Sequence, residues 1–115
     1  MKLQDQLVSL ELSKELKECG YKQKGYFWWK KDDADAYIVA DNSRYKISKG
    51  SLLCIAPTVA ELGEALPCAT KRGDIRFYNI GKQKHIMMGD VDIIEYSEAD
   101  ARAKMYIYLQ KEGLI

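Results

Sequence analysis

The sequence has few of the residues that build metal, redox or disulfide sites. It contains one histidine and three cysteines in 115 residues, and the cysteines, at positions 19, 54 and 68, form no C-x-x-C pair. This spacing gives no support for a zinc or dithiol site, and an odd number of cysteines argues against a secreted disulfide scaffold. Each thiol is better explained as a small buried hydrophobic side chain. We therefore predict no metal and no cofactor.

An excess of one charge and a long hydrophobic run are also missing. The 18 basic and 17 acidic residues leave a net charge of +1, so bulk charge does not attract the chain to polyanions. No run approaches the ~20 apolar residues of a membrane span, and the N-terminus lacks the cationic and apolar regions of a secretory signal. A chain that is 47% apolar and 30% charged suits one globular domain. We predict a single cytoplasmic domain over residues 1–115 that does not enter a membrane.

Three segments have the apolar periodicity and the end signals of helices. Each begins with a serine or threonine that can cap a helix, and the three ranges are 9–19, 58–66 and 97–112. Thr58 and Glu61 have the spacing of a capping box, and we expect the Ser9 hydroxyl to cap the first helix. Gly20 and Gly113 suit the left-handed residue that follows a helix end.

Six further segments are typical of strands, three before the second helix and three after it. They cover 26–29, 36–40, 51–56, 74–80, 84–88 and 91–96. The polar run between the first two predicts a hairpin. Grouped strands with helices between the groups indicate an α+β fold with mainly antiparallel pairing. We predict the order α-β-β-β-α-β-β-β-α, with the helices packed on one face of the sheet.

Catalytic patterns are not present. His85 is the only histidine, and no serine or cysteine pattern supplies an activated nucleophile beside it, so we predict that His85 is structural or exposed. The acidic run 32–35 fails the calcium-loop pattern, because Ile38 and Arg44 occupy the sixth and twelfth positions counted from Asp33. We predict that the protein is not an enzyme.

Aromatic residues are the most unusual feature of the chain. Four stand in a row at 26–29, and on a strand Tyr26 and Trp28 face one side while Phe27 and Trp29 face the other. Tyr26, Trp28, Lys30 and Tyr37 then form a candidate surface for a protein partner. The alternative is that both sides are covered, one by helices and one by a loop or a second copy of the chain. An exposed aromatic face would also suit a homodimer.

A second candidate surface is basic. The segment 71–84 predicts a hairpin with five cations and one acid, and its cations are Lys71, Arg72, Arg76, Lys82 and Lys84. Such a hairpin is able to contact nucleic-acid phosphates. The same charges on an edge hairpin also serve to prevent aggregation. Nucleic-acid binding is therefore the alternative to binding a protein.

Three stretches of the sequence resemble a known family. The runs 56–67 and 98–109, together with the helix 9–20 and the Tyr21-Lys22-Gln23 that follows it, are similar to small proteins encoded in phages, prophages and mobile elements of gut bacteria. The resemblance covers about half of the chain. It implies a phage-related origin and an intracellular setting, and it carries over no activity and no functional residues.

Overall fold

The computed structural model describes residues 3–31, 35–40 and 52–115. The elements, in chain order, are a short 3₁₀ helix at Leu3–Gln6, α1 Leu10–Glu18, β1 Phe27–Lys31, β2 Ala36–Ala40, β3 Leu52–Ile55, α2 Val59–Ala65, β4 Ala69–Thr70, β5 Gly73–Ile80, β6 Gln83–Met88, β7 Val91–Glu95 and α3 Glu98–Lys111. The predicted α+β class and element order are confirmed, and the two-residue β4 is an addition to them. No helix within the described ranges is long and apolar enough to span a bilayer.

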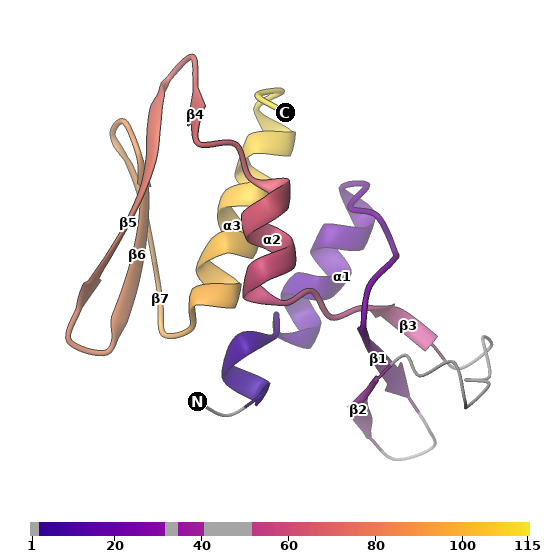
Figure 1. The fold of residues 1–115 in the computed structure, drawn as a ribbon. Coiled ribbons are helices and arrows are strands. Elements are labelled where there is room, and N and C mark those ends of the chain that lie inside the picture. The colour runs from indigo at the N-terminus through magenta and orange to yellow at the C-terminus, as the bar shows by residue number, and fades with distance from the viewer. Residues whose placement is uncertain (1–2, 32–34, 41–51) are drawn as a thin grey trace.

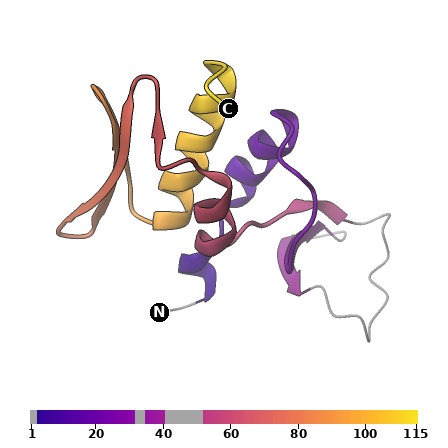
Figure 2. The same ribbon diagram turned by 45° about the horizontal axis from the view of Figure 1, so that its top comes forward.

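The strands form two antiparallel sheets, one on each side of the helices. One sheet has the order β2-β1-β3 and the other β4-β5-β6-β7. Figures 1 and 2 show the three helices between the two sheets, with α3 against β5–β7. The sequence predicted a single sheet, and this is wrong because the strands form two. After β3 the chain crosses the helical layer through α2, so β3 pairs with β1 and not with β5.

The core is built around α3, which is buried on two sides. On one side it packs against α1 and α2, through a cluster of Val8, Leu16, Leu62, Ala99, Ala103 and Ile107. On the other side it packs against the four-stranded sheet, through Leu66, Ile86, Met88, Ala101, Met105 and Leu109. Three alanines in the first two turns let α3 lie close to both neighbouring layers.

The first helix begins where the sequence predicts, but it is capped differently. Ser9 is the N-cap residue, yet its hydroxyl makes no capping hydrogen bond. Its backbone N–H instead donates to Asp100 Oδ1 of α3 at 2.8 Å. The preceding residue, Val8, donates its N–H to the Pro57 carbonyl at 3.1 Å. Long-range contacts therefore fix this helix start, and a local serine cap does not.

The second helix has the predicted capping box. Thr58 Oγ1 accepts from the Glu61 N–H at 3.1 Å, and Glu61 Oε1 accepts from the Thr58 N–H at 3.0 Å. Gly63, which weakens the middle of this helix, has a packing reason: a Cβ there would collide with Arg102 Nη1. The Arg102 guanidinium lies between α2 and β5, 4.3 Å from the centre of the Phe77 ring.

Candidate functional site

The predicted hairpin places the candidate protein-binding residues on one face of β1 and β2. Lys30 pairs directly with Tyr37 in this antiparallel register, and Trp28 pairs with Val39. Directly opposite residues in an antiparallel pair project to the same face, so Trp28, Lys30 and Tyr37 lie together. Tyr26 is 70% exposed immediately before β1, and Tyr37 is 40% exposed. We call Tyr26, Trp28, Lys30 and Tyr37 the aromatic face.

The opposite side of the same segment holds it to the rest of the protein. Trp29 Nε1 donates to the Val8 carbonyl at 3.2 Å, and Gln23 Oε1 accepts from the Ile55 N–H at 2.9 Å. The Tyr21 ring packs edge-to-face on Tyr106 of α3, with ring centres 5.2 Å apart. The sequence left two interpretations of the four aromatics: one exposed side, or a strand covered on both sides. The structure uses the inner side for packing. On the aromatic face, Trp28 and Lys30 are half-buried and the two tyrosines are exposed.

A groove lies beside the connection from α1 to β1. It encloses about 540 Å³ between this connection, α2 and α3, which is within the size range of ligand pockets. Lys22 and Lys24 line it on one side, and Glu61 and Glu64 line it on the other. Burial above all, and then the nearby Glu61 carboxylate, raises the pKa of Tyr21 to about 12. The phenol therefore stays protonated and neutral at physiological pH.

The structure does not bring the five basic residues of the alternative site together. Lys71 and Lys82 lie in the turns at opposite ends of β5, a strand that spans roughly 25 Å. The Arg76 side chain is 79% exposed and contacts Asp74 at 3.9 Å. Lys84 is half-buried and pairs with Glu95 in the sheet register. The segment therefore offers separate cations and not one phosphate-binding surface.

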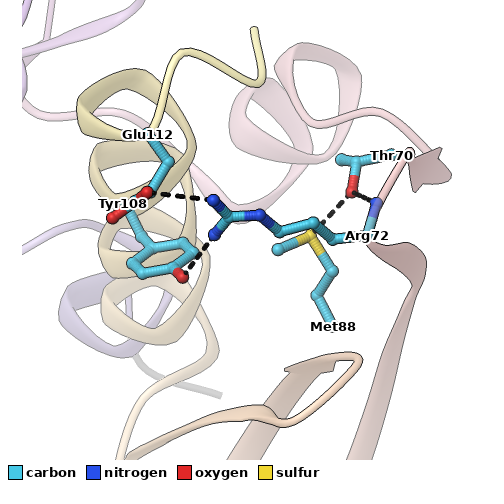
Figure 3. A network of polar contacts seen from close by, with 5 residues as sticks. All are labelled: Thr70, Arg72, Met88, Tyr108 and Glu112. Carbon is cyan, nitrogen blue, oxygen red and sulfur yellow. Dashed lines mark hydrogen bonds and ion pairs between the residues drawn. The ribbon is translucent and has the colours of Figure 1, made fainter.

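The fifth of these residues, Arg72, has a structural role. Its Nη1 donates to Tyr108 Oη at 3.0 Å and its Nη2 contacts Glu112 Oε2 at 3.2 Å, as Figure 3 shows. In the same network, Thr70 Oγ1 accepts from the Arg72 N–H at 3.1 Å and contacts Met88 Sδ at 2.9 Å. Arg72 thus links the β4–β5 turn to the C-terminal end of α3, and its guanidinium already has partners there.

His85 is buried in a small polar cluster on the face of the four-stranded sheet opposite to α3. It is 5% exposed, its Nδ1 contacts Asp92 Oδ1 at 3.2 Å, and its ring stacks on Tyr78 with centres 4.5 Å apart. Tyr78 Oη donates to Asp92 Oδ2 at 3.3 Å, which closes the cluster. His85 Nε2 is buried without a hydrogen-bond partner among the described residues. The sequence left His85 either structural or exposed; the structure buries it, and the sequence did not reveal its partners.

The cysteines and acidic residues make no further site in the part of the chain that the structure describes. All three cysteines are free thiols, but only Cys54 is buried as predicted, since Cys19 is half-buried and Cys68 is exposed. Burial raises the pKa of Cys19 and Cys54. No group of three histidine, cysteine or carboxylate side chains within these ranges is arranged to hold a metal ion. Residues 32–34 of the acidic run lie outside the described residues.

Comparisons with known proteins add no relative to these observations. No family model, no curated protein and no solved structure matches the chain.

Proposed function

We propose that the protein is a non-enzymatic cytoplasmic binding module that docks another protein on the aromatic face. The observation that carries this proposal is the exposure of Tyr26, immediately before β1, and of Tyr37 on the face that carries Trp28 and Lys30. Tyrosine and tryptophan are enriched among the residues that supply most of the energy of protein interfaces. Their rings bury a large area and lose little side-chain entropy when they are fixed.

The internal packing of this region supports the same proposal. Trp29 and Gln23 already hold the segment from its inner side, so the outer aromatic residues are not needed to attach the hairpin. A pre-formed hairpin that presents exposed aromatic rings has less to order on binding, and this favours affinity. The three free thiols suit a reducing compartment. A phage-related origin stays a prediction that rests on the sequence resemblance.

The test is a quantitative comparison of partners captured from a bacterial lysate by variants of the chain. Tyr26→Ala and Tyr96→Ala are a matched pair, because the two tyrosines are 70% and 76% exposed and Tyr96 is next to the other sheet. We expect Tyr26→Ala to retain about tenfold less of the proteins that the wild type binds, as measured by mass spectrometry. Tyr96→Ala should bind like the wild type.

Folding and self-association are the controls for that comparison. Both tyrosine variants should keep the free energy of unfolding within about 0.5 kcal/mol of the wild type, since both side chains are largely in solvent. If the captured protein is a second copy of the chain, gel filtration will show a dimer that Tyr26→Ala dissociates. Equal capture by Tyr26→Ala and the wild type would refute the aromatic face as the docking surface.

A further inference from the structure

The aromatic face continues into the connection between α1 and β1 as a stripe of alternating residues. From Lys22 to Tyr26 the even-numbered residues are exposed and the odd-numbered ones are partly buried. Trp28 and Lys30 follow at the same two-residue spacing in β1, where both are half-buried. We call Lys22, Lys24, Tyr26, Trp28 and Lys30 the basic–aromatic stripe. In Figures 1 and 2 this connection runs along the outside of the molecule, from the C-terminal end of α1 to β1.

The stripe is fixed in place because the alternate residues are anchored. Tyr21 packs on Tyr106, Gln23 accepts a hydrogen bond from β3, and Trp29 donates one to Val8. These contacts alternate with the stripe residues along the chain. The lysines and aromatic rings of the stripe are therefore held in one order on an ordered backbone, which lowers the entropy cost of binding an extended partner.

The charge of the stripe is of one sign. The segment 20–31 contains four lysines and no acidic residue. Five ion pairs are found in the described part of the chain, and Lys22, Lys24 and Lys30 take part in none of them. Ammonium groups without an ion-pair partner among the described residues can pair with carboxylates of a bound protein, and such charges add specificity and speed to association.

We infer that the partner segment is an acidic peptide with aromatic or apolar residues, bound in an extended form along the basic–aromatic stripe. This inference rests on the proposed function, and it names the chemistry of the partner. Carboxylates would pair with Lys24 and Lys30, and apolar side chains would cover Tyr26 and the exposed part of Trp28. The backbone of β1 already pairs with β2 and β3, so side chains carry the recognition along this strand.

The groove next to the stripe favours a peptide over a single-stranded nucleic acid. Glu61 and Glu64 line the groove across from Lys22 and Lys24. A nucleic acid carries a negative charge at every phosphate, and these carboxylates would repel it at this end of the stripe. A peptide is able to place a neutral or basic residue beside them and acidic residues farther along. Charge complementarity therefore points to a peptide whose acidic residues lie in the part that is bound along β1.

The test uses a labelled random copolymer of glutamate and tyrosine as the acidic aromatic probe, with binding measured by fluorescence anisotropy. The double variant Lys24→Gln/Lys30→Gln removes charge from the stripe. Lys71→Gln/Lys82→Gln removes the same charge from exposed positions at the two ends of β5. We expect the stripe variant to bind the probe about tenfold more weakly than the wild type, and the β5 variant to bind it normally. Wild-type affinity should also fall as the ionic strength rises.

Three results would overturn the inference. The first is a wild-type protein that does not bind the copolymer, and the second is equal binding by the stripe variant. The third is tighter binding of an oligothymidylate, which would assign the stripe to single-stranded nucleic acid. These results can be told apart from a failure of the proposed function. The lysate experiment with Tyr26→Ala tests whether proteins of any charge dock on the aromatic face. If that variant loses its partners while the copolymer is not bound, only the acidic chemistry is wrong.

Discussion

The two sheets are attached to the helices by different forces. Buried apolar side chains attach the four-stranded sheet to α3, chiefly Ile86 and Met88 of β6 against Met105 and Leu109. Buried Cys54 and Ile55 of β3 help to attach the three-stranded sheet. Two side-chain hydrogen bonds also hold it in position. Trp29 Nε1 donates to the Val8 carbonyl, and Lys17 Nζ donates to the Leu53 carbonyl at 2.8 Å. The first attachment combines a large apolar cluster with polar contacts such as Arg72–Glu112, and the second combines two buried residues with these hydrogen bonds.

The outer faces of the two sheets differ in whether their side chains have partners inside the fold. On the four-stranded sheet, Tyr78 and His85 stack on each other and both contact Asp92. On the three-stranded sheet, Tyr26 is exposed and Lys30 is in none of the ion pairs of the described residues. Side chains that have partners inside the fold contribute to stability, and those without them are available to a partner. This difference supports the proposal that a partner docks on the smaller sheet.

The largest effect should come from the apolar attachment. Ile86→Ala removes a fully buried side chain between β6 and α3, and we expect it to lower the free energy of unfolding by about 2–5 kcal/mol. Ile94→Ala is the control, because Ile94 is exposed on the other face of the same sheet and should cost less than about 1 kcal/mol. Urea denaturation measures both. Equal losses would show that the sheet is not anchored through the α3 interface.

A smaller effect should come from the hydrogen-bonded attachment. Trp29→Phe keeps an aromatic ring and removes the indole N–H that donates to the Val8 carbonyl, so we expect a loss of about 1 kcal/mol. Trp28→Phe makes the same change on the aromatic face and should cost less. The same denaturation assay measures both variants. A larger loss for Trp28→Phe would mean that the two sides of β1 have been assigned in the wrong order.

The smallest effect should appear as a change in pH dependence. Burial raises the pKa of the half-buried Asp100 carboxyl, although the Ser9 N–H hydrogen bond opposes the shift. The folded state then holds this proton more tightly than the unfolded chain, so stability falls as pH rises just above the ordinary carboxyl pKa of about 4. Asp100→Asn retains an oxygen for Ser9 and should flatten this fall. Unfolding at a series of pH values tests it, and parallel profiles would contradict it.

Local signals in the sequence predicted most of the elements. The Thr58–Glu61 capping box, the glycine ends of α1 and α3 and the β1–β2 hairpin each depend on residues close together in the chain, and each is present. The position of the aromatic residues on opposite sides of a strand followed from the two-residue period of strands. That the four residues of the aromatic face bind a partner stays a prediction.

Features that depend on distant contacts were not predictable from these signals. Whether β3 pairs with β1 or with the later strands is decided by how the chain crosses the helices, and the sequence shows no local sign of it. Arg72 belongs to a basic run, yet its ion pair with Glu112 joins residues forty positions apart. Asp100, from a helix far along the chain, likewise accepts a hydrogen bond from the Ser9 N–H and helps to fix the start of α1. A charged residue in a sequence is therefore a candidate for binding only when the structure shows that it has no internal ion-pair partner.

The close approach of Arg102 to Gly63 has a consequence for engineering this protein. Replacing a glycine inside a helix by alanine is ordinarily a simple way to gain stability, on the order of 1 kcal/mol. Here a new methyl group would displace the guanidinium from its position beside Phe77. A designer who wishes to make α2 more rigid must therefore set the gain from alanine against the contact with Phe77 that Arg102 loses when it moves.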